Sequence, residues 1–533
     1  MKKTLAIVLA LILAMAAFTG CDSKKTASNG GSIEKTTPDS YPIETDETLT
    51  YWMVVSGHVT AVVPSLNETP HAKALIEQTG INVKFIHPVV GQESESFNLL
   101  LSSGDLPDII EYDWKNKYPG GVDKAISDKI ILPLNGVFEK VSPNIMKYAK
   151  DNPQVDKLLK TTGGSYYGYP MLILDDKLLT FRGPMVRKDL LEKAGLEEPE
   201  TIEEWDIMLR KFKEMGIDTP ITLNLSSAHL ESMSAFLGAY GLTGGFFVDN
   251  GTVKYGPYEK DYEKYVNLMA TWYKDGILDK NFTDVDTKRV TALVTSGEVG
   301  AAFGSAGGDF GTWLPVLSET VPEANFQPIK YPVLNKGDRP FTGQKSFPVG
   351  NNYACISATS KNAELAARLL DYGYSEAGHM LYNFGIEGES YTMENGEAIY
   401  TDKIMDIEKN GGISVGQAMG QYIRANSTGP FRQAVGYLDQ FYTNPVQRNA
   451  VGIWADTDAL DHAIPGGIMN AEENKEYSKI MSDVNVYKEE FLYKAVTGKV
   501  SLDSFAQYYA AMKDMGIERA IEIYQGAYDR YMK

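Results

Sequence analysis

Two hydrophobic periods alternate along the first folded part of the chain, from residue 49 to residue 112. Short apolar runs predict strands, and stretches with apolar residues three and four apart predict helices. The strands are predicted at 49–55, 81–86 and 108–112, and the helices at 69–79 and 93–103. Gly80 and Gly104 end the two helices. The order strand, helix, strand, helix, strand predicts right-handed crossovers and a largely parallel sheet.

The same patterns continue to the end of the chain. Further helices are predicted at 202–215, 258–275, 287–295, 363–375, 472–490 and 501–532, and further strands at 299–303 and 353–358. An extended stretch at 178–184 predicts a crossing into a second lobe, and a return is expected near 326–332. Residues 411–449 are expected to be irregular, because they are rich in glycine, proline and tyrosine.

These elements predict an α/β protein of two lobes. With 533 residues the chain is too long for a single core. We expect lobe 1 to begin with 49–180 and lobe 2 to cover 181–330. Residues 331–533 would return to lobe 1 and add C-terminal helices shared with lobe 2.

The N-terminus has a different pattern. Two lysines precede an apolar run from Leu5 to Phe18, which is shorter than the ~20 residues of a membrane-spanning helix. Small residues then lead to Cys21, as at the end of a secretory signal. A cysteine at this point resembles the lipobox of bacterial lipoproteins, which implies removal of 1–20 and lipidation of Cys21. The alternatives are an ordinary signal peptide with an incidental cysteine, or a short buried helix. Residues 21–48 are polar and predict a flexible tether.

Charge and cysteine content exclude several classes of function. The net charge of −19 argues against nucleic acid and anionic lipid as general partners. Lipidation of Cys21 would leave Cys355 without a partner, so no disulfide is expected. Cys355 lies in an apolar run and is predicted to be a buried, inert thiol.

Catalytic and metal-binding motifs are missing from the sequence. It contains no Walker A, HExxH, CxxC or GxSxG pattern, and no metal or cofactor is expected. Asp284 and Asp286 are interpreted as a cluster at the start of a helix rather than a calcium loop. Glu387, Glu389 and Asp113 could serve glycoside hydrolysis, but among 70 acidic residues close pairs are unavoidable.

Five segments, in order along the chain, resemble one family. They are the Gly-Asp-Leu-Pro-Asp run within 97–110, Gly168–Pro170, 187–205, Gly297–Phe303 and Gly385–Tyr391. These segments resemble extracellular solute-binding proteins of carbohydrate ABC importers, in the large lipoprotein branch of Gram-positive bacteria. The resemblance implies a periplasmic-binding-protein-like fold (class II type) with an interlobe cleft and a hinge. It also implies a monomeric, membrane-anchored receptor that delivers a carbohydrate to an ABC permease, and the size of the chain favours an oligosaccharide over a monosaccharide.

Candidate ligand-binding residues follow from the chemistry of sugars, which offer C–H faces to aromatic rings and hydroxyls to polar groups. Ligands of α/β sheets sit beyond the carboxyl ends of the strands, and Gly304 would permit close backbone approach. By resemblance, the segment with Glu387 and Tyr391 borders the cleft. The candidates are Asp113, Trp114, His58, Gly304, Ser305, Trp313, Tyr353, Glu387, Tyr391 and Arg182.

Two rival functions remain open at this stage. A peptide or other polar-solute receptor of the same architecture would need charged anchors and would show fewer stacking rings. A secreted carbohydrate-active enzyme would need a pair of carboxylates on either side of the bound sugar.

Overall fold

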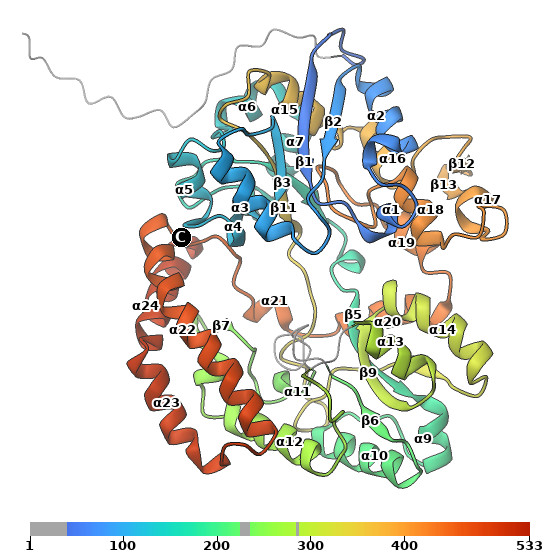
Figure 1. The fold of residues 1–533 in the computed structure, drawn as a ribbon, viewed down its shortest axis with the longest axis vertical. Helices are drawn as coiled ribbons and strands as arrows, with labels where there is room; N and C mark the ends of the chain where they lie inside the picture. Colours follow the sequence, from blue (N-terminus) through green and yellow to red (C-terminus); the bar gives the residue numbers. More distant parts are fainter. Residues whose placement is uncertain (1–39, 224–234, 284–286) are drawn as a thin grey trace, which may run out of the picture.

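The computed structural model describes residues 40–223, 235–283 and 287–533. These residues form two lobes, one above the other in Figure 1, each built on its own sheet and its own hydrophobic core. The two-lobe α/β architecture expected from the sequence is therefore confirmed. Cys21 and most of the predicted tether lie outside the described residues.

Lobe 1 contains a five-stranded sheet in the order β2-β1-β3-β11-β4. Its strands are β1 (Thr48–Met53), β2 (Asn82–Ile86), β3 (Ile109–Tyr112), β4 (Tyr169–Leu172) and β11 (Val349–Ile356). The first three are parallel, as the sequence predicts, and β11 runs antiparallel to both of its neighbours. The carboxyl ends of the parallel strands therefore meet at one edge of the sheet.

The first helices of lobe 1 begin and end where their capping residues predict. In α2 (Pro70–Thr79) the Thr69 hydroxyl accepts a hydrogen bond from the backbone of Ala72, and Gly80 ends the helix at φ 71°. In α3 (Glu93–Ser103) Gly104 does the same at φ 70°. A side chain at Gly80 would also collide with the Ile43 carbonyl, since its Cβ would lie 2.2 Å from that oxygen.

Other helices surround this sheet. They are α1 (Gly57–Thr60), α4 (Trp114–Lys117), α5 (Gly121–Ser127), α6 (Asn135–Val141), α7 (Pro143–Asp151), α8 (Pro153–Leu158), α15 (Ala363–Tyr372), α16 (Glu376–Asn383), α17 (Asp402–Met405), α18 (Val415–Tyr422) and α19 (Val435–Phe441). A small hairpin, β12 (Tyr391–Glu394) and β13 (Glu397–Tyr400), stands at the side of the lobe. The expectation of irregular structure over 411–449 was wrong, because α18 and α19 lie within it.

Lobe 2 contains a four-stranded sheet in the order β10-β5-β9-β6. Its strands are β5 (Arg182–Arg187), β6 (Thr219–Ile221), β9 (Val299–Ser305) and β10 (Phe326–Pro328). A hairpin of β7 (Phe246–Asp249) and β8 (Thr252–Tyr255) lies apart from it. Because β10 pairs with β5, the stretch expected to return to lobe 1 near 326–332 still belongs to the second sheet.

Most helices of lobe 2 bury apolar side chains in the core around this sheet. They are α9 (Lys188–Ala194), α10 (Ile202–Glu214), α11 (Ala235–Gly238), α12 (Tyr262–Lys274), α13 (Thr287–Thr295), α14 (Gly308–Thr320), α20 (Pro445–Ala455) and α21 (Ala459–His462). Thr201 and Glu204 form a capping box at the start of α10. Trp205 of α10 and Trp272 of α12 are fully buried.

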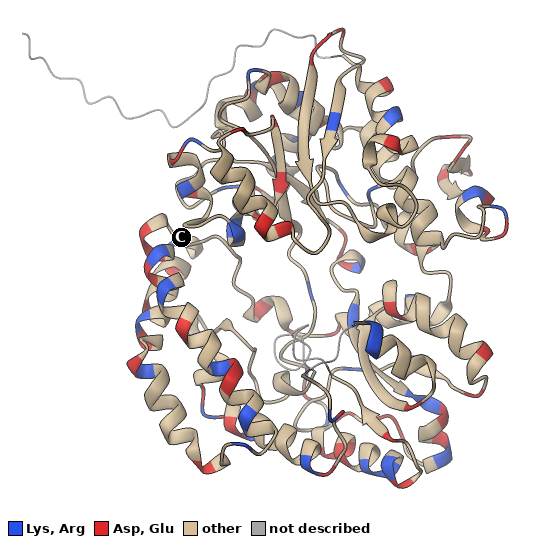
Figure 2. Cartoon of the chain, viewed as in Figure 1, with Lys and Arg blue, Asp and Glu red and all other residues tan. Residues whose placement is uncertain are grey.

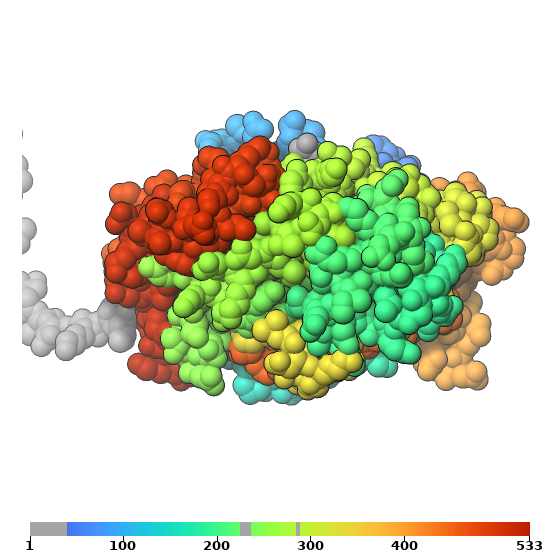
Figure 3. All heavy atoms as spheres, turned by 90° about the horizontal axis from the view of Figure 1, so that it is seen from below, coloured from blue at the N-terminus to red at the C-terminus, as the bar shows by residue number. Residues whose placement is uncertain are grey.

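Three C-terminal helices, α22 (Ala471–Val496), α23 (Phe505–Asp514) and α24 (Ile517–Met532), lie along one side of the molecule (Figure 1). Seen from below, they lie beside the helices of lobe 2 (Figure 3), and they share its core. The single helix predicted at 501–532 is divided because Gly516 adopts φ 96°. Near the end of α24, Tyr531 contacts lobe 1: the Lys157 ammonium lies 4.1 Å from its ring centre.

Three segments of the described chain connect the lobes: β4 to β5, β10 to β11, and α19 to α20. The first two are bonded to each other. Gln344 accepts a hydrogen bond from the Phe181 amide (2.7 Å), and the Ser346 amide donates to the Leu179 carbonyl (2.8 Å). Connecting segments bonded to each other in this way are positioned to act as a hinge. In the described part of the chain, no helix is long and apolar enough to cross a membrane.

Buried ionisable groups in lobe 1 give the fold a predictable response to acid. Burial lowers the pKa of His71 to about 3, with the Arg424 charge adding to the effect. The stability contributed by neutral His71 is therefore complete above its ordinary pKa and is lost as the pH falls toward 3. Burial raises the pKa of Asp371 to about 6, which acts in the opposite direction over the same range.

We expect the variant His71→Gln to show a weaker loss of stability in acid than the unmodified chain. One pKa unit corresponds to about 1.4 kcal/mol. Between pH 7 and pH 4 the unmodified chain should therefore lose about 3 kcal/mol more of its free energy of unfolding than the variant does. Urea denaturation at a series of pH values measures it. The change of the free energy of unfolding with pH is the readout, because the variant is expected to differ in absolute stability as well. Parallel curves for the two proteins would contradict this assignment.

Candidate functional site

A cavity of about 840 Å³ lies between the two lobes, beside the segments that connect them. Its walls come from 171–182 and 343–352 of the first two crossings, from 425–442 before the third, and from the turn between β9 and α14. His58 contributes from α1, just beyond the carboxyl end of β1. The volume is typical of a ligand site, and the position is the one predicted for an α/β sheet.

Aromatic rings form part of the wall. Phe181 is 40 % exposed, which is unusual for so large an apolar side chain, and Phe347 and Phe441 are half-buried. Phe441 is held by stacking on Tyr437 at 5.6 Å between ring centres, and it packs against Gly307 of the opposite lobe. The cavity therefore offers apolar ring faces from the first two crossings and from α19 of lobe 1.

Polar groups complete the lining. Asn351, Asn352 and Gln433 supply side-chain amides. Two buried atoms of lining residues, the Oγ1 of Thr180 and the Oδ1 of Asn426, have no hydrogen-bond partner among the described residues. Buried polar atoms are nearly always paired, so these two atoms are exceptions within the wall of the cavity.

A buried ion pair supports the floor of the cavity in lobe 1. Arg424 lies 3.3 Å from the Glu111 carboxylate, and both side chains are at most 5 % exposed. Glu111 also accepts hydrogen bonds from the hydroxyls of Tyr51 and Thr428, each at 2.6 Å. Burial, followed by the Glu111 charge, raises the pKa of Tyr51 and keeps its donor proton in place. Through Thr428 this network positions the loop that lines the cavity.

The structure brings three of the predicted site residues together at the cavity: His58, Arg182 and Ser305. Burial lowers the pKa of His58, which therefore contributes a neutral ring at neutral pH. The Ser305 hydroxyl donates to Asp309 at 2.9 Å and accepts from its backbone amide at 3.1 Å. This pairing fixes the turn between β9 and α14.

Two predicted tryptophans cannot stack on a ligand in this structure. Trp114 is 0 % and Trp313 1 % exposed. The Trp114 ring donates to the Ile110 carbonyl at 3.1 Å, and the Trp313 ring to the Thr291 hydroxyl at 3.2 Å. Both are core residues, and their assignment to the ligand site was wrong.

Three further candidates also lie away from the cavity. Tyr353 is fully buried in β11 and donates to the Leu158 carbonyl at 2.9 Å. Gly304 lies within β9 rather than in a loop, and Met185 and other side chains fill the space that its Cβ would need. Asp113 caps α4 by accepting the backbone amide of Asn116. These three contribute to the fold and do not line the cavity.

Glu387 and Tyr391 line a different hollow, of about 700 Å³, on lobe 1. It is bordered by Tyr41, Tyr372 and α16 and receives no residue from lobe 2. The expectation that this segment borders the interlobe cleft is therefore not met.

Sequence reasoning missed the residues that line the cavity from the crossings, among them Phe181, Lys345 and Phe347. For Phe181, the sequence contained one signal of its position. The stretch 178–184 was recognised as a crossing, and a large aromatic residue in a connecting segment has no sheet to pack against. Residues 343–347 carried no comparable pattern, because their position depends on the pairing with the first crossing.

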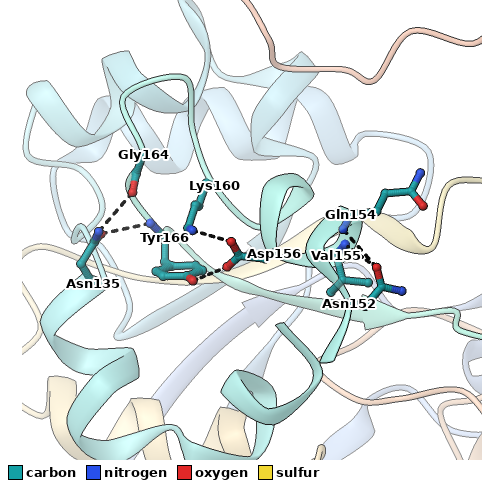
Figure 4. Close-up of polar contacts among 8 residues, drawn as sticks. All are labelled: Asn135, Asn152, Gln154, Val155, Asp156, Lys160, Gly164 and Tyr166. Carbon is teal, nitrogen blue, oxygen red and sulfur yellow. Dashed lines mark hydrogen bonds and ion pairs between the residues drawn. The ribbon is translucent and has the colours of Figure 1, made fainter. Parts of the chain in front are cut away.

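A smaller cavity of about 210 Å³ lies between lobe 1 and the end of α24. Several of its basic residues have partners nearby. Lys160 pairs with Asp156 at 2.6 Å beside Tyr166 (Figure 4), and Arg530 pairs with Glu473. This cavity falls below the usual size of a ligand site, so the interlobe cavity is the stronger candidate.

The described residues contain no group of three or more His, Cys, Asp or Glu side chains that could hold a metal ion. Cys355 is buried, as expected, and burial raises the pKa of its thiol. The pair Asp284 and Asp286, interpreted above as a cluster at the start of a helix, lies outside the described residues.

The chain is similar to a family of known proteins. A family model described as bacterial extracellular solute-binding protein matches residues 64–380. Lipoprotein LipO of Bacillus subtilis is 23% identical over 432 residues, covering 77% of this chain and 76% of LipO. The fructooligosaccharide ABC transporter substrate-binding protein FusA of Streptococcus pneumoniae is 24% identical over 405 residues, covering 71% of this chain and 70% of FusA.

Solved structures share the fold. Alginate-binding protein AlgQ2 superimposes with a TM-score of 0.73 at 24% identity, covering 91% of this chain and 99% of AlgQ2. FusA of Streptococcus pneumoniae in complex with kestose gives a TM-score of 0.69 at 20% identity, covering 91% of this chain and 99% of FusA.

Proposed function

Because the chain belongs to the family of bacterial extracellular solute-binding proteins, we propose that it captures an oligosaccharide outside the cell and delivers it to an ABC permease. The observation that carries this proposal is the 840 Å³ cavity between two hinged lobes, with exposed ring faces and amide groups in its wall. Rings suit the C–H faces of sugars, and amides suit their hydroxyls.

The names of similar proteins support a carbohydrate as the ligand. FusA is a fructooligosaccharide-binding protein, YtcQ of Bacillus subtilis binds polygalacturonan and rhamnogalacturonan, and AlgQ2 binds alginate. The volume of the interlobe cavity accommodates more than one sugar ring, which favours an oligosaccharide over a monosaccharide.

Capture follows from the way the cavity is divided between the lobes. On one side the ligand would contact Phe181 and the lobe 1 amides, and on the other the β9–α14 turn of lobe 2. It can contact both lobes only when they are close together. It therefore binds the closed form more tightly and shifts the equilibrium toward that form. The permease would then recognise the closed receptor.

The proposal includes a lipid anchor on Cys21. Two acyl chains would give stable membrane retention where one would not, and the polar tether would give the receptor reach. Mass spectrometry of the N-terminal peptide from the membrane fraction tests this part. A free cysteine, or an unprocessed N-terminus, would contradict the anchor without affecting the binding function.

We propose further that the ligand is not cleaved. Glycoside hydrolysis needs two carboxylates on either side of the scissile bond, and the described residues that line the cavity include no aspartate or glutamate. In the test, the full-length chain is incubated with a panel of oligosaccharides and peptides. Thermal stabilisation should rise with the concentration of an oligosaccharide, and chromatography should recover that oligosaccharide intact. Cleaved product, or stabilisation by peptides alone, would refute the proposal.

Within that experiment, we expect Phe181→Ala to weaken oligosaccharide binding by about 1–3 kcal/mol, because the variant loses an exposed stacking face. Isothermal titration calorimetry measures the change. Leu334→Ala is the matched control, since Leu334 is a 45 % exposed apolar residue that does not line the cavity. Equal affinities for the two variants would exclude Phe181 as a ligand contact.

A further inference from the structure

The charges around the interlobe cavity differ from those of the whole chain. The protein carries a net charge of −19, and acidic residues are distributed over the elements of both lobes (Figure 2). The described residues that line the cavity nevertheless include Lys345 and Arg182 and no carboxylate. The electrostatic potential inside the cavity is therefore more positive than the net charge of the chain suggests.

Lys345 is the more informative of the two cations. It is half-buried in the second crossing, and the described residues form no hydrogen bond or ion pair with its ammonium. Most lysines that this structure shows in ion pairs lie on outer surfaces, such as Lys330 with Asp456 at 3.4 Å. Lys345 instead faces a cavity in which no described residue offers it a counter-charge.

The backbone on both sides of Lys345 is fixed. The neighbouring Gln344 is bonded to the Tyr331 hydroxyl at 2.9 Å and to the Phe181 amide at 2.7 Å, and Ser346 is bonded to Leu179 at 2.8 Å. The backbone of Lys345 is thus held at the junction of two crossings, and Lys345 and Phe181 line the same cavity. A ligand that stacks on the Phe181 ring therefore shares that cavity with the lysine side chain.

From this arrangement we propose that the cavity selects an acidic oligosaccharide, one that carries carboxylates as uronates do, and that Lys345 is its principal counter-charge. This inference rests on the proposed carbohydrate-receptor function and narrows its substrate class. When the lobes close on a ligand, the lysine loses water, and that loss is costly unless an opposite charge replaces it. A carboxylate on the sugar supplies the charge, whereas a neutral sugar leaves the ammonium without a counter-ion.

The proposal is tested with pairs of oligosaccharides that share linkage and length and differ in oxidation at C6, such as oligogalactose and oligogalacturonate. The full-length chain is titrated with both members by calorimetry. We expect the acidic member to bind about tenfold more tightly. The variant Lys345→Ala should lose that advantage and keep its affinity for any neutral glycan, while Lys345→Arg should retain it. Lys330→Ala, a surface control, should behave like the unmodified chain.

Each other result has a definite meaning. Equal or tighter binding of neutral oligosaccharides overturns the preference for acidic ligands but leaves the receptor function intact. Binding of sulfated glycans without binding of uronates overturns the assignment to carboxylates. If the acidic member binds but Lys345→Ala keeps the full preference, the role of Lys345 is refuted. If no glycan binds, the proposed function itself fails, and the inference fails with it.

Discussion

Replacing Arg424 by methionine is expected to lower the free energy of unfolding by about 3–5 kcal/mol, because the change leaves a charged carboxylate buried without its ion-pair partner. Glu111 of β3 is 2 % exposed, and Arg424 lies 3.3 Å from its carboxylate. The hydroxyls of Tyr51 and Thr428 would remain as donors, but neither carries a charge. The urea midpoint and slope of the variant measure the loss.

A double variant separates the cost of the isolated charge from the cost of changed packing. In Glu111→Gln combined with Arg424→Met, no charge is left alone, so part of the stability should return. The double variant should therefore be more stable than Arg424→Met. If Arg424→Met were as stable as the unmodified chain, the ion pair would contribute nothing to the fold.

The same substitution should reach the ligand site. Arg424 also donates to the Thr428 carbonyl, and Thr428 lines the interlobe cavity. Loss of the pair would free the 425–428 loop, so ligand affinity should fall together with stability. Phe181→Ala differs in this respect, since it is expected to affect affinity alone. Comparing the two variants distinguishes the support of the cavity from its contact surface.

The parts of the fold that the sequence predicted are those specified locally. The parallel order of β1, β2 and β3 followed from the alternation of apolar periods, and the ends of α2 and α3 followed from Gly80 and Gly104. Such signals act within a few residues and need no knowledge of distant contacts. The length of the chain and the extended stretch at 178–184 predicted two lobes, and the family motifs implied a cleft and a hinge between them.

The candidate site could not be predicted in the same way, because its residues come together through distant pairings. Trp114 follows a strand, as a ligand residue would, yet it is turned into the core, where Phe97 packs against its ring at 5.2 Å. The position of Lys345 depends on the bonds of Gln344 to the first crossing, more than 160 residues earlier. The pattern of hydrophobic and polar residues along the chain does not predict either contact.

The second large loss of stability is expected from a change in α20, the helix that follows the third crossing. Trp454→Ala should lower the free energy of unfolding by about 3–5 kcal/mol, the usual cost of removing a buried tryptophan. Trp454 is 0 % exposed in α20, and its ring nitrogen donates to the Pro184 carbonyl of β5 at 3.1 Å. It thereby joins the first crossing to the third on the lobe 2 side. Differential scanning calorimetry and urea denaturation both measure the loss.

Gly183 provides a sharp test of how that contact works. A Cβ added at Gly183 would lie 2.4 Å from atoms of the Trp454 ring, so Gly183→Ala should destabilise the unmodified chain by about 1–3 kcal/mol through overpacking. In the Trp454→Ala background the ring is absent, and the added methyl occupies space that the ring has left. There Gly183→Ala should be close to neutral. The two changes should therefore be strongly non-additive, as expected for residues in direct contact. Additive losses would show that the ring does not pack on Gly183 in solution.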